Sequence, residues 1–155
     1  MRRKEKEIKD RAAVETVIQE SLVCRLGLCD HEGTPYIVPV CFGYSGGDLY
    51  IHSSPQGKKM ELLKEDPRVC VEFEAEAEPL PAEEACGWTM RYRSVIAFGK
   101  ASIVEDKEER RKALDAIIDH YTRGPHHYAP KGLDKISVIR VRIERMTGKQ
   151  GGIQD

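Results

Sequence analysis

Two short turn sequences in the first third of the chain constrain the fold most. Residues 30–33 (Asp-His-Glu-Gly) and 45–48 (Ser-Gly-Gly-Asp) separate three apolar runs, at residues 23–29, 35–44 and 49–52. Glycine, aspartate and serine at such positions are typical of tight turns between strands. Parallel neighbours need a crossover of about a dozen residues or more. Turns this short therefore predict three consecutive antiparallel strands.

The rest of the chain continues this mainly β pattern. Further strands are predicted at residues 68–74, 92–104 and 136–146, the second with a break at Gly99. In the last of them, apolar residues (Ile139, Val141 and Ile143) alternate with charged ones (Arg140, Arg142 and Glu144). Helices are predicted from apolar spacing at residues 10–22, 55–65 and 107–123. Because an open sheet leaves edges to protect, we expect a closed or nearly closed antiparallel barrel with helices around it.

Length and composition favour one domain over residues 1–155. The chain is 40% hydrophobic and 33% charged, which suits a single core. Residues 1–9 and 151–155 are expected to be frayed tails. Residues 75–86 are rich in glutamate and contain two prolines, so they are expected to form an exposed, mobile loop.

Charge and cysteine content exclude several classes of function. The net charge of −1 gives no field that would favour nucleic acid or an anionic membrane. No apolar run approaches the ~18 residues of a membrane span, and the charged N-terminus lacks the apolar core of a signal peptide. The five cysteines include no C-x-x-C pair, which predicts reduced thiols in the cytoplasm and no metal site.

The end of the third predicted strand is a candidate phosphate site. There Ser53 and Ser54 supply hydroxyls, and Lys58 and Lys59 supply charges at the start of a helix. A helix start also offers unpaired N–H groups and the positive end of the helix dipole. In the alternative interpretation, Ser54 caps an ordinary helix that begins at Pro55, and the lysines are only solvated. The segment is neither a P-loop nor a G-x-G-x-x-G dinucleotide motif.

Several segments together resemble a known family. These segments are residues 34–44, residues 49–53 with Gly57-Lys58-Lys59, residues 66–70, Trp88 with residues 92–95 and 99–101, and residues 147–149. They resemble the flavin-binding split-barrel proteins related to pyridoxamine phosphate oxidase, and most closely the nitroimidazole-resistance (Nim-like) branch. The resemblance covers about residues 22–150. It implies a mainly β (α+β) fold, a six- to seven-stranded antiparallel split β-barrel with flanking helices. It also implies a homodimer that binds FMN between its subunits, with FAD or haem as alternatives.

The resemblance also implies roles for individual residues. The ribityl phosphate would be held by two serines and two lysines: Ser53, Ser54, Lys58 and Lys59. The isoalloxazine edge would lie along the backbone of Val38, Pro39 and Val40. The site would be completed, in part from the second subunit, by Trp88, Tyr92, Arg93 and Ser94. Arg93 or Lys149 could stabilise the negative charge of a reduced flavin, or either could be a plain surface cation.

Two further residues are open to more than one interpretation. A proline in a central strand removes a ladder hydrogen bond, so Pro39 predicts a sheet edge, a bulge or a backbone stretch that faces a ligand. His52 ends its strand just before the phosphate segment, so it is a candidate catalytic residue that carries a proton beside the ring. A structural hydrogen bond is the alternative for His52.

Departures from the family pattern limit the expected reaction. True pyridoxamine phosphate oxidases carry an arginine in the flavin-contacting strand and an Arg-x-His pattern near the end, whereas residues 38–42 hold no arginine and no histidine follows His127. We therefore expect an FMN-dependent oxidoreductase that reduces a small acceptor such as a nitro-aromatic. The alternative is a flavin- or haem-binding protein without turnover, with His52, His126 and His127 as candidate axial ligands. A third possibility is an interaction protein with an empty barrel.

Overall fold

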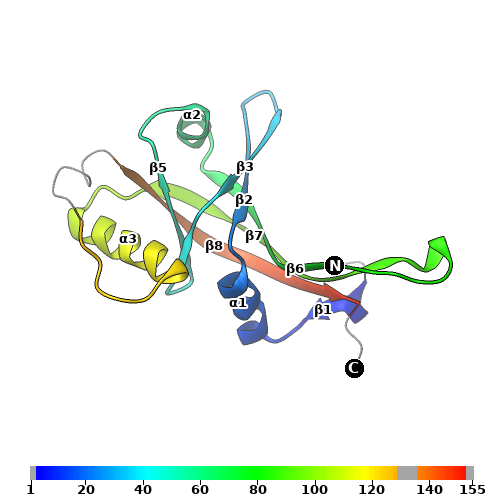
Figure 1. Ribbon diagram of the computed structural model, residues 1–155. Helices are drawn as coiled ribbons and strands as arrows, with labels where there is room; N and C mark the ends of the chain where they lie inside the picture. The colour runs from blue at the N-terminus through cyan, green and yellow to red at the C-terminus, as the bar shows by residue number, and fades with distance from the viewer. Residues whose placement is uncertain (1–2, 129–135, 153–155) are drawn as a thin grey trace.

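The computed structural model describes residues 3–128 and 136–152, and its elements are labelled in Figure 1. The strands are β1 (Glu7–Ile8), β2 (Cys24–Cys29), β3 (Pro35–Val40), β4 (Gly43–Ser45), β5 (Asp48–Ser53), β6 (Arg68–Leu80), β7 (Thr89–Ile103) and β8 (Ser137–Gly151). The helices are α1 (Arg11–Glu20), α2 (Lys58–Glu65) and α3 (Lys107–Tyr121), with short 3-10 helices η1 (Lys4–Lys6) and η2 (Ala85–Gly87).

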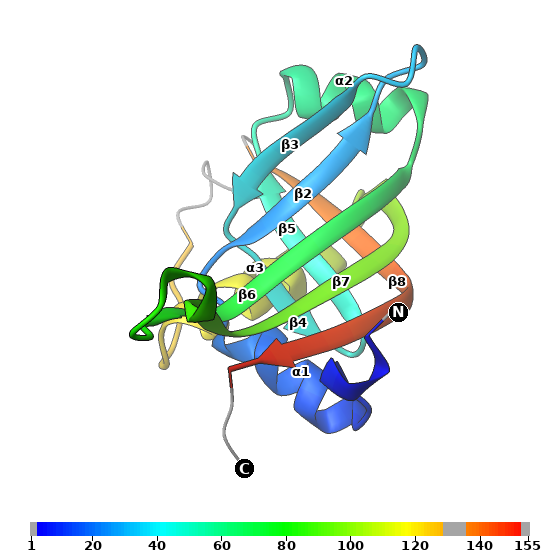
Figure 2. The ribbon, with the colours of Figure 1, turned by 90° about the vertical axis from the view of Figure 1, so that its right-hand side faces the viewer.

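All strands belong to one antiparallel sheet that curls on itself. The strand order is β3-β2-β6-β7-β8-β5-β4, and β1 pairs with β8. The strand predicted at residues 35–44 is broken at Cys41 and Phe42, so its two halves, β3 and β4, lie at opposite ends of this order. This short link brings the two ends of the sheet together as a barrel (Figure 2). The predicted antiparallel split barrel with flanking helices is confirmed.

The barrel core follows the alternation of the strands. Inward-facing side chains such as Leu26, Val71 and Val141 are fully buried, as expected from the apolar side of each strand. Helix α1 packs Val14, Val17 and Ile18 into the same cluster. Helix α3 packs against β4 and β5, and its apolar side joins a second, smaller cluster (Val104, Ala113, Leu114, Ile117 and Val138).

The segment predicted as an exposed, mobile loop, residues 75–86, is strand in its first half (residues 75–80), whereas residues 81–86 are exposed and belong to no strand. β6 continues to Leu80 and pairs with the first residues of β7, from Thr89, so that residues 75–93 form a long hairpin, called the arm here. The arm extends away from the barrel in Figure 1. Its glutamates are compatible with a strand because Glu76 and Glu78 pair with arginines opposite them. The glutamate-rich composition suggested a loop because composition does not reveal the arginines on the neighbouring strand.

Two local features bear on the sequence predictions. The predicted break at Gly99 is present as a register shift between Phe98 and Gly99, and a Cβ at Gly99 would collide with the carbonyl oxygen of Arg142. Residues 4–8, expected to be part of a frayed tail, form η1 and β1. At the other end, β8 extends to Gly151, and the remaining tail residues, 1–2 and 153–155, lie outside the described part.

Side chains that alternate with the core residues form an outer face on β3, β2, β6, β7 and β8. One cross-strand row on this face runs through Ile37, Gly27, Cys70, Phe98 and Arg145. Large apolar side chains are exposed on this face: Ile37 is 67% exposed and Phe98 is 38% exposed. This outer face is the setting of the candidate site.

Candidate functional site

The helix that follows the predicted phosphate segment begins later in the chain than Pro55, the start that one interpretation predicted. β5 ends at Ser53 and α2 begins at Lys58, so the alternative in which Ser54 caps a helix that begins at Pro55 is wrong. The N-cap is Gly57, whose φ of 113° suits glycine. Because Gly57 has no side chain, the first turn of α2 receives no side-chain cap.

Several donors in this segment have no partner within the described residues. They are the backbone N–H groups of Gly57, Lys58 and Lys59. Ser54 contributes a hydroxyl, which accepts from the N–H of Gln56 at 3.3 Å. An anion is the natural ligand for a helix start with free N–H groups and lysines beside it.

The two lysines differ in their surroundings. Lys58 is exposed, whereas Lys59 is half-buried where α2 packs Met60, Leu62 and Leu63 into the barrel core. Partial burial lowers the pKa of Lys59 below its ordinary value. A half-buried ammonium without a carboxylate partner in the described chain is therefore suited to a bound anion.

The predicted flavin-contacting backbone lies on a strand with a free edge. β3 stands at the end of the strand order and pairs only with β2 among the described strands. The side chains of Val38 and Val40 pack against the core, and Pro39 is exposed opposite Arg25. The edge interpretation of Pro39 is confirmed. Alternate backbone groups of an edge strand point away from its neighbour, so this segment can offer hydrogen bonds to a planar ligand.

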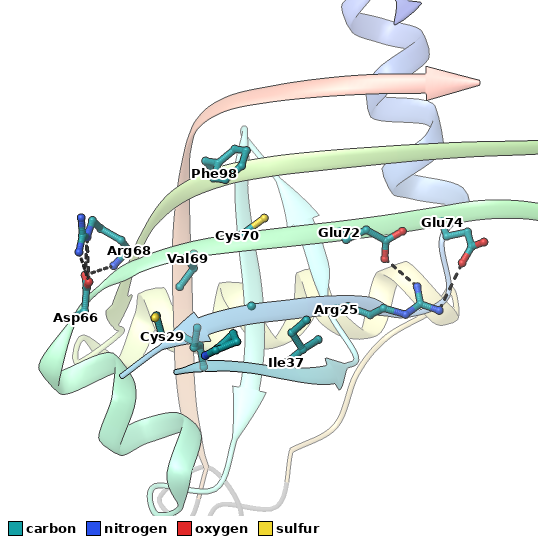
Figure 3. Close-up of a pocket in the computed structure, with 13 residues that line it drawn as sticks. Arg25, Cys29, Ile37, Asp66, Arg68, Val69, Cys70, Glu72, Glu74 and Phe98 are labelled. Atoms are coloured by element: carbon teal, nitrogen blue, oxygen red, sulfur yellow. Dashed lines mark hydrogen bonds and ion pairs between the residues drawn. The ribbon is translucent and has the colours of Figure 1, made fainter. Parts of the chain in front are cut away.

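A groove of about 760 Å³ crosses the outer face beside β3 (Figure 3). Its middle is apolar, with Ile37 and Phe98 on either side, and Gly27 lies between Ile37 and Cys70 in the cross-strand row. Because Gly27 has no side chain, the groove is deeper at this position. We call it the outer groove. Its full lining is Arg25, Gly27, Leu28, Cys29, Pro35, Ile37, Asp66, Arg68, Val69, Cys70, Glu72, Glu74 and Phe98.

Ion pairs close both ends of the outer groove (Figure 3). At one end Arg25 lies 2.8 Å from Glu72 and 3.5 Å from Glu74. At the other end Arg68 lies 2.6 Å from Asp66, and hydrogen bonds from Arg68 lower the pKa of Asp66 to about 2. Sequence reasoning missed these residues. The sequence did contain a sign of the groove, because large apolar side chains occupy positions of the predicted strands that alternate with the core positions.

A second group of predicted residues lies further along the outer face, at the base of the arm. Ser94 is directly opposite Lys149, and the ammonium of Lys149 lies 5.5 Å from the centre of the Tyr92 ring. Ser94 and Lys149 line a cavity of about 200 Å³ together with Ile96 and Thr147. The structure thus brings Tyr92, Ser94 and Lys149 together.

Two other predicted residues of this region lie elsewhere. Arg93 is on the opposite side of β7, where its guanidinium lies 2.7 Å from Glu20 of α1 and 3.1 Å from Glu76 of β6. Both partners are carboxylates of the same chain, so this guanidinium is already neutralised. Trp88 is 57% exposed and lies just after η2, near the tip of the arm.

His52 is separated from the other candidates. It is exposed on the same side of β5 as Tyr50, whose ring packs against the cluster beneath α3, whereas Ile51 and Ser53 point inward. The described residues place no hydrogen-bond partner on its ring. The arrangement contains no carboxylate relay for His52.

The histidines considered for haem are not gathered either. The Nε2–H of His126 donates a hydrogen bond of 2.8 Å to the Asp119 carboxylate, His127 is exposed, and both histidines follow α3 rather than β5. Over residues 3–128 and 136–152, no group of three or more histidine, cysteine or acidic side chains is arranged to hold a metal ion. Within the same ranges, no helix is long and apolar enough to cross a membrane.

The two groups of candidate residues lie apart in one chain. The phosphate segment is next to α2 at one end of the barrel, and Tyr92, Ser94 and Lys149 lie at the other, where β8 ends beside the arm (Figures 1 and 2). The outer groove lies on the face between them. One protomer therefore presents two half-sites at opposite ends of the barrel.

Comparisons with known proteins agree with this fold. A family model described as pyridoxamine 5'-phosphate oxidase matches residues 10–150. A structure from Bacteroides thetaiotaomicron, provisionally assigned as a 5-nitroimidazole antibiotic resistance protein, is 37% identical, with 92% of this chain and 85% of that chain covered and a TM-score of 0.83. An FAD-binding protein from Mesorhizobium loti is 25% identical, with 92% and 96% covered and a TM-score of 0.68.

A more distant structure shares the fold alone. It is the FAD and haem binding protein from Mycobacterium smegmatis, which is 23% identical, with 97% of this chain and 76% of that chain covered and a TM-score of 0.84. The comparison with curated proteins returned no match.

Proposed function

The chain belongs to the pyridoxamine 5'-phosphate oxidase family, and on that premise we propose that it is an FMN-dependent oxidoreductase whose cofactor binds between two copies of the chain. The observation that carries the proposal is the pair of half-sites. An anion site and a donor-bearing site lie at opposite ends of the barrel, so two copies packed head to tail would join them.

The residues of the first half-site fit the ribityl phosphate of FMN. Free N–H groups at the start of α2, the hydroxyl of Ser54, and the ammonium groups of Lys58 and Lys59 supply donors and positive charge, whereas Ser53 is buried and points inward. The free edge of β3 at Val38–Val40 would hydrogen-bond the polar edge of the ring. FMN would supply the electron transfer, and the protein would bind and orient it and exclude water.

The outer face also supports a homodimer. Ile37, Trp88, Met90, Ile96 and Phe98 are exposed by 38% or more on this face or on the arm that continues it. A contiguous apolar surface of this kind usually marks an interface. A second copy would bury it and would bring Tyr92, Ser94 and Lys149 to the partner's phosphate segment.

The proposed substrate is a small acceptor of the nitro-aromatic type. This class is taken from the 37% identical protein, whose assignment concerns 5-nitroimidazole resistance. The outer groove, with an apolar middle and charged ends, offers a surface on which a planar acceptor can lie beside the flavin edge.

The test is retention of flavin by the purified protein. We expect visible flavin absorption to remain after FMN is added and excess is removed on a desalting column. A Lys58→Ala/Lys59→Ala variant should lose it, because the phosphate loses two cations, whereas Lys64→Ala, exposed on the same helix, should retain it. A wild-type protein that retains no FMN would contradict the proposal, and a Soret band after haem addition would favour the haem alternative.

A turnover measurement tests the catalytic part separately. Bound FMN reduced with dithionite should be reoxidised by a nitro-imidazole under anaerobic conditions. If the protein retains flavin but no nitro-aromatic reoxidises it, the protein binds flavin without this reductase activity.

A further inference from the structure

The N-terminal segment lies outside the part of the chain that the family model matches, yet it contacts the second half-site. The match begins at residue 10, whereas η1 and β1 cover Lys4–Ile8. β1 pairs with the end of β8, with Glu7 opposite Lys149 and Ile8 opposite Gly148. A Cβ at Gly148 would lie 3.0 Å from Cβ of Ile8, so the glycine allows this close packing.

This pairing brings a second ammonium group to the Tyr92 ring. The Nζ atom of Lys6 lies 5.9 Å from the ring centre, and that of Lys149 lies 5.5 Å from it. Gly151 makes the arrangement possible, since a Cβ there would lie 2.7 Å from Cε1 of Tyr92 and 3.2 Å from Nζ of Lys6. Both lysines are half-buried.

The charges around the ring are not balanced by close ion pairs. In the described part of the chain, no carboxylate oxygen lies within 4.0 Å of either ammonium, although Glu7 is the cross-strand neighbour of Lys149. The adjoining cavity of about 200 Å³ adds the hydroxyls of Ser94 and Thr147. Lys149 lines this cavity and Lys6 lies beside the same Tyr92 ring, and two cations so close together favour a ligand that carries negative charge.

We propose that Lys6 is a further cation of the flavin site, where it acts with Lys149 to stabilise negative charge on the reduced ring of FMN bound by the partner protomer. The inference rests on the proposed function. Reduction by two electrons and one proton leaves the ring with one negative charge. A hydride donor supplies both the electrons and the proton, whereas with dithionite the proton comes from water. A nearby cation stabilises that form more than the neutral oxidised form, and so raises the reduction potential.

The test is the midpoint potential of FMN bound to the full-length protein. In Lys6→Gln the affinity for reduced FMN should fall about tenfold relative to that for oxidised FMN, a drop of ~30 mV for a two-electron couple. Lys6→Arg, which keeps the charge, should retain the wild-type potential. Lys9→Gln removes a nearby exposed charge that does not contact Tyr92, and should also leave the potential unchanged.

The outcomes separate this inference from the proposed function. Flavin bound with the same potential in wild type and Lys6→Gln would overturn the role of Lys6 and leave the flavoprotein proposal standing. A wild-type protein that binds no FMN would overturn both. A loss of potential in Lys6→Arg equal to that in Lys6→Gln would show that packing of the N-terminal segment, and not charge, is responsible, which also overturns the inference.

Discussion

At the scale of single residues, Lys59 shows how a binding group can oppose folding stability. Its pKa is lowered because α2 places it where water is partly excluded. The folded protein therefore holds the charged form less favourably than the unfolded chain does. Such a cost is expected where a residue is kept for a ligand rather than for the fold.

We predict that Lys59→Met weakens FMN binding roughly tenfold, the value of one charge-assisted hydrogen bond, without lowering the stability of the flavin-free protein. Titration with FMN and thermal unfolding measure the two effects, and Lys64→Met is the matched control. A less stable variant that binds FMN as tightly as wild type would contradict the role given to Lys59.

The same residue gives a pH dependence with a defined sign. The folded-state pKa of Lys59 lies below its ordinary value of 10.5, so between the two values the unfolded chain binds more protons. The contribution of Lys59 to the free energy of unfolding of the flavin-free protein should therefore rise with pH in the window just below 10.5. Urea unfolding across this window should show that contribution in wild type and not in Lys59→Met.

At the scale of elements, the arm depends on a clamp at its base. Arg93 joins β7 to Glu76 of β6 and to Glu20 of α1, so it fixes the direction in which the hairpin leaves the barrel. Because the half-site of Tyr92, Ser94 and Lys149 lies at this base, the clamp also fixes the half-site.

We predict that Arg93→Gln increases amide hydrogen exchange in residues 75–92 several-fold, since losing two partly exposed ion pairs costs about 1 kcal/mol. Exchange in the core of β6, near Val71, should not change. Arg91→Gln, which removes pairs only to Glu76 and Glu78, is the control for charge loss in the arm. Equal exchange in the arms of Arg93→Gln and wild type would contradict the clamp.

The elements also show where sequence patterns fail. Alternation and turn residues predicted the strands and the three helices, because those signals are local. The break at Cys41 and Phe42 was missed because it is caused by distant contacts: the N–H of Phe42 donates to the hydroxyl of Tyr121, and that hydroxyl donates to the carbonyl of Leu22. The strand in residues 75–80 was missed for the same reason, since its partners come from β7.

At the scale of the whole molecule, the proposed function makes the outer face the dimer interface and the setting of the site. Residue type and spacing marked the phosphate segment in the sequence, whereas the family resemblance implied Tyr92, Ser94 and Lys149. Neither showed that the candidates divide into two groups at opposite ends of the barrel, because that division depends on cross-strand register. The outer groove was likewise absent from the sequence interpretation, since Ile37 and Phe98 meet only through β2 and β6.

We predict that Phe98→Glu yields a folded monomer that retains little FMN. A second copy would bury the apolar side chain of Phe98, and a charge in its place would have to lose its water on assembly, which is unfavourable even beside Arg145, the residue opposite it. Light scattering at micromolar concentration measures the mass, and the visible spectrum measures FMN. Leu22→Glu, at a residue that is 72% exposed and precedes β2, should remain dimeric. A dimeric Phe98→Glu protein would place the interface on another face.

The pairing of β8 has a consequence for the order of synthesis. Three strands are held by pairing with β8. In β5, Ser53 is opposite Ser137, in β7 Ser94 is opposite Lys149, and in β1 Glu7 is opposite Lys149. All three pairings wait until β8 has left the ribosome. A nascent or truncated chain without β8 therefore has neither half-site in place, and under the proposed function it cannot load FMN.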